Sequence, residues 1–593
     1  MPDRCQIASL LGSLALKLAL LSAYGAAVAA EAIELPPEQM AAYEADGPKS
    51  ILELQPFRQH WSIPAHDGKD RHGSATLIEL NPNVNAWFIL SLTWNDGSAF
   101  SYHLENPYPQ SQRLALKPSQ PRGLYIDTED KSRICKLWLG EPSAIARAST
   151  SSLPYAPLCG NRLYLRNTVE GRRTDLERVT DFLRDHVWGG EAVVGFVRNQ
   201  FYQDAYLDRG APSPGSSADL SSHLEGPRPA LLNEAYVGRK MAPGHLGIAL
   251  DDTTSPQLAI GQWYPAAKAS SVYLSVIQPQ AVSQDILTGH AETLAPLDPV
   301  EAQAIDYLIA FDLADLDLGF ALGTDHPRVH WSKRPPAEIR GTSMPGPDGI
   351  GSIAPLVTNG TIGPTLVDRT VAAFTGGFKR SHGAFKYGDL AVRNRGSHYG
   401  FAEGGTILSK LQPGLATFYR LEDGSLDMKT WSEADDVLLP RIQFARQNGV
   451  PLVDIDPRTG QSRPGDLVKY WGRGNWSGTA EGKFRALRAG ACLQETSEGS
   501  FLIYGYFSSA TPSAMARVFQ AYGCRYAMHL DMNALEHTYL ALYHRRGDHV
   551  VIEHLIKGME VVDKSLDDNA LPRFTAVPDN RDFFYVIKRD DKK

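Results

Sequence analysis

The chain has 593 residues, of which 43% are hydrophobic and 21% charged, and its formal net charge is −8. This length exceeds what one ordinary hydrophobic core needs, so we expect two or three domains. The mildly acidic, globular composition argues against nucleic acid and anionic membrane surfaces as partners.

Residues 1–30 have the pattern of a secretory signal peptide. Arg4 precedes an apolar stretch at 7–21, and small residues at 26–30 offer a cleavage site before Glu31. The uninterrupted apolar runs are shorter than the ~20 residues that a membrane span needs, although an uncleaved anchor is the alternative. The pattern predicts a secreted or periplasmic protein without stable membrane insertion after processing.

The cysteines fit an exported chain. Cys5 would leave with the signal peptide, and the mature chain keeps four cysteines, an even number that permits two disulfides in an oxidising compartment. Local pairing predicts Cys135 with Cys159 and Cys492 with Cys524, and buried free thiols are the alternative.

Residues 31–207 predict a β-rich N-terminal domain without a catalytic constellation. Strand patterns occur at 75–80, 85–93 and 162–165. One helix is expected at 175–188, where an apolar face ends at a glycine pair. The aromatic residues of this domain are expected in its core, with a sugar-stacking platform as the alternative. They include Trp87, Trp94, Tyr102 and Tyr108.

Residues 208–233 are rich in Pro, Ser and Gly, which predicts a linker or long loop before a second domain at 234–593. Inside that domain, a capping box of Asp298 and Glu301 predicts a helix that runs to Asp312.

The clearest unit of the chain combines two strands and a helix. An apolar run at 501–507 predicts a strand buried on both faces, Thr511 caps a helix that Gly523 ends, and a second strand follows at 525–530. A helix between two strands favours a crossover with parallel pairing, a βαβ unit. The predicted fold class is therefore mixed α/β or α+β, behind a β-rich N-terminal domain.

Candidate chemistry gathers at the end of this unit. Asp531 follows the second strand at its carboxyl end, where α/β sheets often place ligands. His529 lies two positions earlier, so alternation predicts that both project to one face. Glu536 and His537 follow closely. These four residues are the predicted centre of a site.

Paired glycines after an apolar strand at 369–374 form a second candidate. Gly376 and Gly377 let backbone N–H groups approach an anion closely, and Lys379 adds positive charge nearby. A tight turn without a ligand is the alternative.

The order of these segments resembles the phosphodiester glycosidase family over residues 358–543. The matching motifs are Gly376-Gly377-Phe378, the segment ARQNGVPLV at 445–453, Arg488 ahead of a strand (with Arg485 as the alternative) and Leu530-Asp531. The chain departs from the family at Thr375, which replaces an asparagine, at Lys379, which replaces a phenylalanine, and at Met532-Asn533-Ala534, which replace glycines.

The resemblance implies an exported hydrolase that cleaves a bond between a sugar and a phosphate-linked or otherwise anionic group on an envelope or extracellular glycan. Asp531 would act as acid, base or nucleophile, and His529 or Glu536 would supply a second proton-transfer group. The residues implied at the substrate anion are Arg488, Lys379, Gly376 and Gly377, beside Thr375 and His537.

Two other interpretations stay open. One is a non-catalytic exported glycan-binding or envelope-assembly protein that keeps the fold. The other is a divalent-metal site built from His529, Asp531, Glu536 and His537; apart from it, no cofactor is expected.

Overall fold

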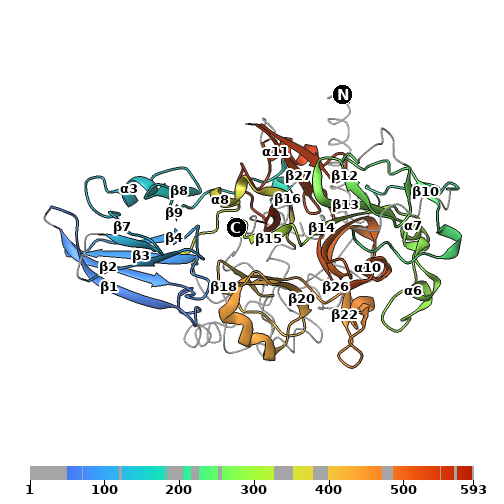
Figure 1. The fold of residues 1–593 in the computed structure, drawn as a ribbon, viewed down its shortest axis with the longest axis horizontal. Coiled ribbons are helices and arrows are strands. Elements are labelled where there is room, and N and C mark those ends of the chain that lie inside the picture. Colours follow the sequence, from blue (N-terminus) through green and yellow to red (C-terminus); the bar gives the residue numbers. More distant parts are fainter. Residues whose placement is uncertain are drawn as a thin grey trace, which may run out of the picture.

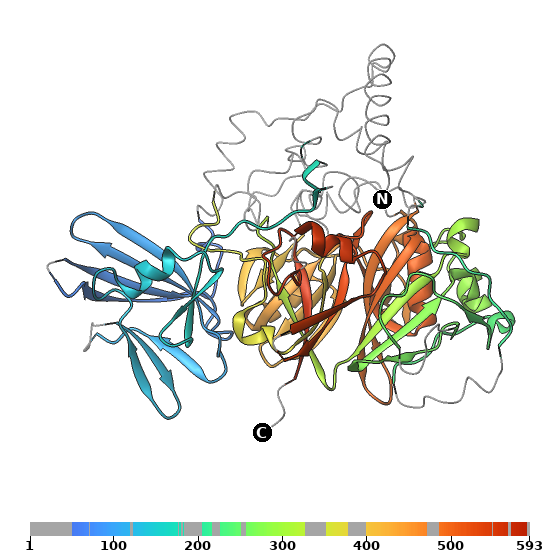
Figure 2. The same cartoon turned by 90° about the horizontal axis from the view of Figure 1, so that it is seen from above.

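The computed structural model describes residues 50–589 except for 70, 119–122, 176, 180–181, 183–203, 205, 216–225, 251–256, 326–351, 378–398, 471–484, 548 and 567–570. A smaller β module, formed by the first part of this span, lies at one end of the molecule, and the remaining sheets form a larger body beside it (Figures 1 and 2). A β-rich N-terminal module is therefore present, as the sequence predicted.

The N-terminal module contains a six-stranded antiparallel sheet and a three-stranded one. The six-stranded sheet has the order β1-β2-β3-β4-β9-β8, and the other has the order β5-β6-β7. Apolar side chains from both sheets share one core. The elements are β1 (Gln59–His66), β2 (His72–Glu79), β3 (Trp87–Trp94), β4 (Ala99–Glu105), β5 (Gln112–Ala115), β6 (Leu124–Thr128), β7 (Ser132–Cys135), α3 (Ala144–Ser149), β8 (Tyr155–Leu158) and β9 (Leu163–Arg166). The strands predicted at 75–80, 85–93 and 162–165 correspond to β2, β3 and β9.

Trp87 and Trp94 of this module are core residues, as predicted. Trp87 and Trp94 are 3% and 5% exposed, whereas Tyr108 is 43% exposed. The guanidinium of Arg166 lies 4.3 Å from the ring of Trp87, which occupies the face that a stacked sugar would need.

An eight-stranded sheet is the centre of the larger body, with the order β12-β13-β14-β25-β24-β26-β22-β23. Nearly every residue of β24 and β25 is buried, because both faces of the sheet are covered. The strands are β12 (Tyr264–Ala266), β13 (Ala269–Ile277), β14 (Asp306–Asp312), β22 (Val453–Ile455), β23 (Ser462–Pro464), β24 (Ala486–Glu495), β25 (Ser500–Ala510) and β26 (Cys524–Met532).

The predicted strand–helix–strand unit is present, but its two strands do not pair. α10 (Pro512–Ala521) connects β25 to β26, and the hydroxyl of Thr511 accepts the Ala514 N–H at 3.2 Å, as expected of an N-cap. β24 lies between β25 and β26 and pairs antiparallel with both. The two strands are therefore parallel in direction, yet the prediction of parallel pairing is wrong because β24, which precedes them in the chain, inserts between them.

The helix predicted from Asp298 to Asp312 ends after one turn. α7 (Pro299–Ala302) has the predicted capping box, in which Glu301 Oε1 accepts the Asp298 N–H at 2.8 Å. The following residues form β14 in the middle of the sheet, so the rest of this prediction is wrong. Every residue from Asp306 to Phe311 is buried, and a short apolar run of this kind does not distinguish a buried strand from a helix.

The body also contains two five-stranded antiparallel sheets, with the orders β15-β29-β16-β27-β28 and β18-β17-β21-β19-β20, and a two-stranded sheet of β10 and β11. The first packs on the eight-stranded sheet through Phe374 and Tyr504, whose ring centroids are 5.1 Å apart. The neighbouring Gly505 faces Phe519 of α10, so the helix covers the opposite face. Phe584 joins the two five-stranded sheets, since its ring lies 5.1 Å from that of Phe418.

The bounds of the remaining elements are as follows. The first five-stranded sheet has β15 (Leu316–Ala321), β16 (Thr370–Thr375), β27 (Leu540–Arg546), β28 (His549–His554) and β29 (Phe583–Lys588). The second has β17 (Phe401–Glu403), β18 (Thr406–Ser409), β19 (Ala416–Leu421), β20 (Leu426–Thr430) and β21 (Ile442–Gln447). The others are β10 (Lys240–Met241), β11 (Leu258–Ala259), α6 (Gln284–Thr288), α8 (Pro364–Val367), α11 (Glu560–Leu566) and the 3₁₀ turns at Glu234–Tyr236, Pro279–Ala281, Glu433–Arg441 and Val468–Tyr470.

Both predicted disulfides are present. The Cα atoms of Cys135 and Cys159 are 5.8 Å apart, and those of Cys492 and Cys524 are 5.9 Å apart. Disulfides persist in oxidising compartments, which fits export. Over the described ranges, no helix is long and apolar enough to cross a membrane. The predicted signal peptide and most of the predicted helix at 175–188 lie outside the described residues.

Candidate functional site

Asp531 lies where β26 becomes irregular. Arg488 is paired with Met532, whereas Gly490 is paired with His529, so β26 has one residue more than β24 between these positions. Such a bulge interrupts the alternation of side chains along a strand. His529 accordingly contacts Arg488, whereas the carboxylate of Asp531 faces a different arginine.

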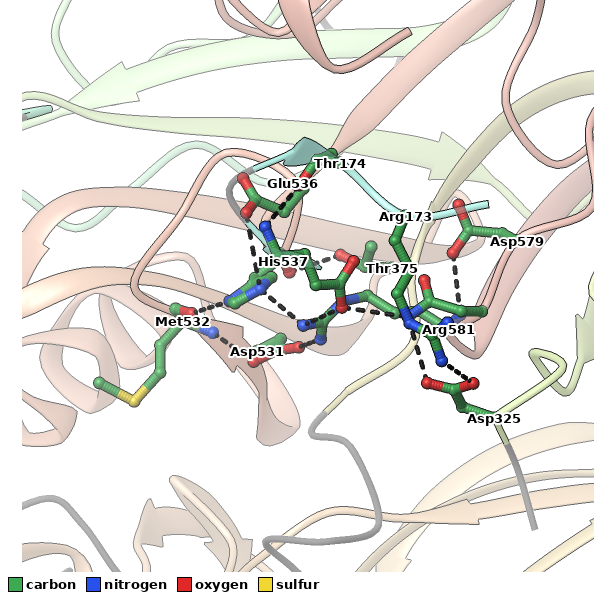
Figure 3. Close-up of polar contacts among 12 residues, drawn as sticks. Arg173, Thr174, Asp325, Thr375, Asp531, Met532, Glu536, His537, Asp579 and Arg581 are labelled. Carbon is green, nitrogen blue, oxygen red and sulfur yellow. Dashed lines mark hydrogen bonds and ion pairs between the residues drawn. The ribbon is translucent and has the colours of Figure 1, made fainter. Parts of the chain in front are cut away.

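That arginine is Arg581, which binds three residues of the site (Figure 3). Asp531 Oδ2 accepts from Arg581 Nη1 at 2.8 Å, and Asp531 Oδ1 accepts the Met532 N–H at 2.8 Å. Arg581 Nη2 lies 2.6 Å from His537 Nε2 and 3.1 Å from Glu177 Oε1. Burial opposes the charge of Arg581, but Glu177 and Asp531 raise its pKa above the usual value.

Both ring nitrogens of His537 have partners. Nδ1 lies 2.8 Å from the carbonyl oxygen of Met532, which can only accept, so Nδ1 carries the proton and Nε2 accepts from Arg581. His537 is therefore neutral in this arrangement. The hydroxyl of Thr375 donates to the carbonyl oxygen of His537 at 2.6 Å, so these two predicted substrate-binding residues lie together.

Glu536 is a buried carboxyl group beside this network. It is 6% exposed, and its Oε1 lies 3.9 Å from His537 Nε2. Burial raises the pKa of Glu536, with Glu177 acting in the same direction and Arg581 and Arg573 in the opposite one. Glu536 consequently holds a proton at a higher pH than an ordinary glutamate.

Arg488 and His529 form a second arginine–histidine pair, and both side chains are fully buried. Arg488 Nη1 lies 3.1 Å from His529 Nε2, and His529 Nδ1 lies 3.2 Å from the carbonyl oxygen of Leu530. Burial and the charge of Arg488 lower the pKa of His529 well below its usual value. Because His529 and His537 both accept from arginines, the carboxyl groups are better suited than the histidines to transfer protons here.

Asn448, in the ARQNG segment, contacts both the Gly-Gly segment and the end of β26. Its Nδ2 donates to the carbonyl oxygen of His529 at 2.6 Å and also to that of Leu530. Gly377 lies against the same side chain, since a Cβ at Gly377 would fall 3.0 Å from the Asn448 amide group. The predicted Gly-Gly, ARQNG and Leu-Asp segments are therefore neighbours. Lys379 lies outside the described residues.

The turn after Asp531 keeps a conformation typical of glycine. Asn533, which stands where the family has a glycine, has a φ of 83°, in the left-handed region that asparagine adopts more readily than most side chains. Its N–H donates to the carbonyl oxygen of Leu487 at 2.8 Å. The side-chain oxygen of Asn533 is buried and has no hydrogen-bond partner among the described residues.

Four polar residues that immediately precede β29 were not predicted from the sequence. They are Asp579, Asn580, Arg581 and Asp582, and each is at most 5% exposed. Besides Arg581, Asp579 pairs with Arg573, Asn580 donates to Glu177 and Asp325, and Asp582 pairs with Arg446 and accepts the Gly376 N–H through its carbonyl oxygen. A run of four polar residues directly before the apolar residues FFYVI was the available indication in the sequence.

The alternative of a metal site gains no support from this geometry. In the part of the chain that the structure describes, no three His, Cys, Asp or Glu side chains are grouped so that they could hold a metal ion. The guanidinium of Arg581 binds both Asp531 and His537, two members of the proposed ligand set.

Comparison with known proteins assigns no relative. No protein-family model matches the chain, and no curated protein matches it significantly. The resemblance to the phosphodiester glycosidases therefore depends on the motifs and on their positions in the structure.

Proposed function

We propose that this protein is an exported hydrolase that cleaves a bond between a sugar and a phosphate-linked or otherwise anionic group on an envelope or extracellular glycan. The observation that carries the proposal is the contact of Asn448 with Gly377 and with the backbone of Leu530, because these residues belong to three motifs that are far apart in the sequence. A chance likeness of short motifs would not require them to be neighbours.

The two carboxyl groups fit this chemistry. Hydrolysis at a sugar carbon needs one group that donates a proton and one that accepts a proton or acts as nucleophile. Asp531 is paired with Arg581, which favours its carboxylate, whereas burial favours the protonated form of Glu536. Hydrolases assign the roles of proton donor and of base or nucleophile to two carboxyl groups by placing them in different environments.

We assign the binding of the substrate's anionic group to hydrogen-bond donors near the two carboxyl groups. The Gly377 amide, together with Lys379, would face the phosphate or other anionic group. The Gly376 N–H, predicted to share this role, does not fit it, because it donates to the carbonyl oxygen of Asp582 at 2.8 Å. Arg488 is fully buried behind His529, so we assign to it a role through His529 as well as through the electrostatic field of the site.

The proposal can be tested with purified exported protein and chromogenic sugar-1-phosphodiesters. We expect turnover by the wild type and a loss of about 100-fold or more in Asp531→Asn, the usual scale for removing a proton-transfer group. Asp317→Asn is a matched control, because Asp317 pairs with Arg420 on other strands of the same body. Full activity of Asp531→Asn, or no turnover by the wild type, would contradict the proposal.

A glycan-binding protein without turnover is the alternative. The internal pairing of Asp531 and His537 with Arg581 favours it, since paired groups are well suited to a fixed binding surface. Calorimetry with a panel of glycans separates the two functions: binding of an intact glycan at full occupancy without hydrolysis would support this alternative.

A further inference from the structure

Arg581 is the one cation that the described residues place in direct contact with both Asp531 and His537. We propose that Arg581 is a positioning residue, which holds Asp531 as a carboxylate and His537 as the neutral Nδ1–H tautomer and thereby leaves proton donation to Glu536. The assignment of Glu536 rests on the proposed function, whereas the protonation states of Asp531 and His537 follow from the geometry.

The geometry of His537 excludes its charged form next to Arg581. An imidazolium would carry a proton on Nε2, which would then point at the Nη2 donors of Arg581 at 2.6 Å. Two donors and two positive charges would face each other at the buried guanidinium of Arg581. The carbonyl oxygen of Met532 keeps the proton on Nδ1, so the ring presents a lone pair to the arginine.

The charges around Arg581 explain why Glu536 is protonated more readily than Asp531 and Glu177. Asp531 and Glu177 each lie within 3.1 Å of the Arg581 guanidinium. Arg573, the next cation, pairs with Asp579 at 2.6 Å and donates to the backbone oxygen of Glu536 at 2.9 Å. The carboxyl group of Glu536 thus forms no ion pair with an arginine among these pairs, and its burial favours the protonated form over the stabilisation that Arg581 and Arg573 give to its charge.

The backbone around Arg581 holds the guanidinium in place. The N–H of Arg581 donates to Asp579 Oδ1 at 2.8 Å, and the next residue, Asp582, pairs with the fully buried Arg446 at 3.0 Å. Asp579 and Asp582, on either side of Arg581, are therefore held by Arg573 and Arg446 before any substrate binds. An arginine held in this way does not need to reorganise during the reaction.

In the proposed reaction, Asp531 takes a proton from water while the oxygen of that water forms a bond to the sugar carbon. The bond from this carbon to the departing oxygen breaks, and the proton of Glu536 goes to that oxygen. Exchange with solvent then removes the proton from Asp531 and returns one to Glu536. Arg581 forms and breaks no covalent bond in these steps.

The test uses the full chain labelled with ¹⁵N-histidine, and it does not depend on turnover. In the wild type we expect His537, assigned by the signal lost in His537→Gln, to stay neutral and protonated on Nδ1 from pH 5 to pH 8. In Arg581→Gln we expect His537 to titrate near the ordinary value of ~6.5. Arg420→Gln, which removes the partner of Asp317, should leave the His537 signal unchanged.

A charged or Nε2-protonated His537 in the wild type at pH 7 would overturn the proposal, and this outcome needs no variant to fold. An unchanged titration of His537 in folded Arg581→Gln would overturn it as well. Where turnover is measurable, Arg581→Gln should also shift the acidic limb of the pH profile upward, which a purely structural role would not do. Absence of turnover with the expected His537 signals would reject the hydrolase and leave the positioning role intact.

Discussion

Gly377 and Asn448 are in direct contact, since a Cβ at Gly377 would fall 3.0 Å from the side-chain amide of Asn448. Gly377 also has a φ of 141°, a conformation that side chains other than glycine rarely adopt. We expect Gly377→Ala to displace Asn448 from the carbonyl oxygens of His529 and Leu530. The free energy of unfolding should fall by ~1–2 kcal/mol, measured by urea titration, and turnover should fall with it.

Gly547→Ala is the control for this substitution. Gly547 also has a positive φ of 62°, but a Cβ there would meet no atom of the described residues within 4 Å. A similar loss of stability without a loss of turnover in this variant would separate backbone strain from the displacement of Asn448. Equal turnover of Gly377→Ala and the wild type would contradict the role given to this contact.

At Asn533 we expect a substitution to increase the free energy of unfolding, the opposite of the effect expected for Gly377→Ala. Because its φ is 83° and its buried side-chain oxygen has no partner in the part of the chain that the structure describes, glycine should suit this position better. We expect Asn533→Gly to raise the free energy of unfolding by ~1 kcal/mol, because removal of the unpaired buried oxygen outweighs the larger entropy of glycine in the unfolded chain. The gain is measured as a higher melting temperature. Asn533→Val should lower it by ~1–2 kcal/mol, because a β-branched residue is strained in the left-handed region. A lower melting temperature for Asn533→Gly would refute this explanation.

Local patterns predicted much of the fold. The cap at Thr511 and the strands around β2 and β3 are encoded by residues that are close in sequence. The error at β14 has the same origin, because the buried run from Tyr307 to Phe311 has no polar side from which a helix or a strand could be recognised.

The candidate site was harder to predict because distant segments build it. Asp531, Glu536 and His537 share one segment and were identified together. Arg581 lies 50 residues beyond Asp531, and Glu177 lies 403 residues before Asn580, its hydrogen-bond partner. Only the tertiary arrangement of the sheets brings these residues together, and local periodicity in the sequence does not predict these contacts.

The disulfide between Cys492 and Cys524 joins β24 to β26, the two strands that carry Arg488 and His529. We expect the double variant Cys492→Ala/Cys524→Ala to lose ~3 kcal/mol of unfolding free energy, the usual scale for a loop of this size. Turnover should fall as well, because the strands that position the site are less constrained.

The other disulfide provides the matched control. Cys135→Ala/Cys159→Ala should destabilise the N-terminal module and leave turnover of the folded protein unchanged. Non-reducing peptide mapping of the exported wild type checks the premise directly. Four free thiols in that experiment would contradict both disulfides.

Glu403 lies where the N-terminal module contacts the larger body, and we expect it to make the free energy of unfolding depend on pH. Arg166 of β9 pairs with Glu105 and reaches Glu403 of β17 at 3.5 Å, and the Leu322 N–H donates to Glu403 at 3.0 Å. Burial raises the pKa of Glu403 to about 7 and outweighs the charge of Arg166, which Glu105 already neutralises. Glu403 is therefore protonated in the folded protein at a pH where it is ionised in the unfolded chain.

The sign of the effect follows from this difference. The folded pKa lies above the unfolded value of 4.5, so the contribution to stability is complete below about pH 4.5 and is lost as the pH rises through 7. The full change is on the order of 3 kcal/mol. We expect the unfolding free energy of the wild type, relative to that of Glu403→Gln, to fall as the pH rises from 5 to 8. Glutamine does not titrate, so a difference that stays constant across the range would rule out the proton on Glu403.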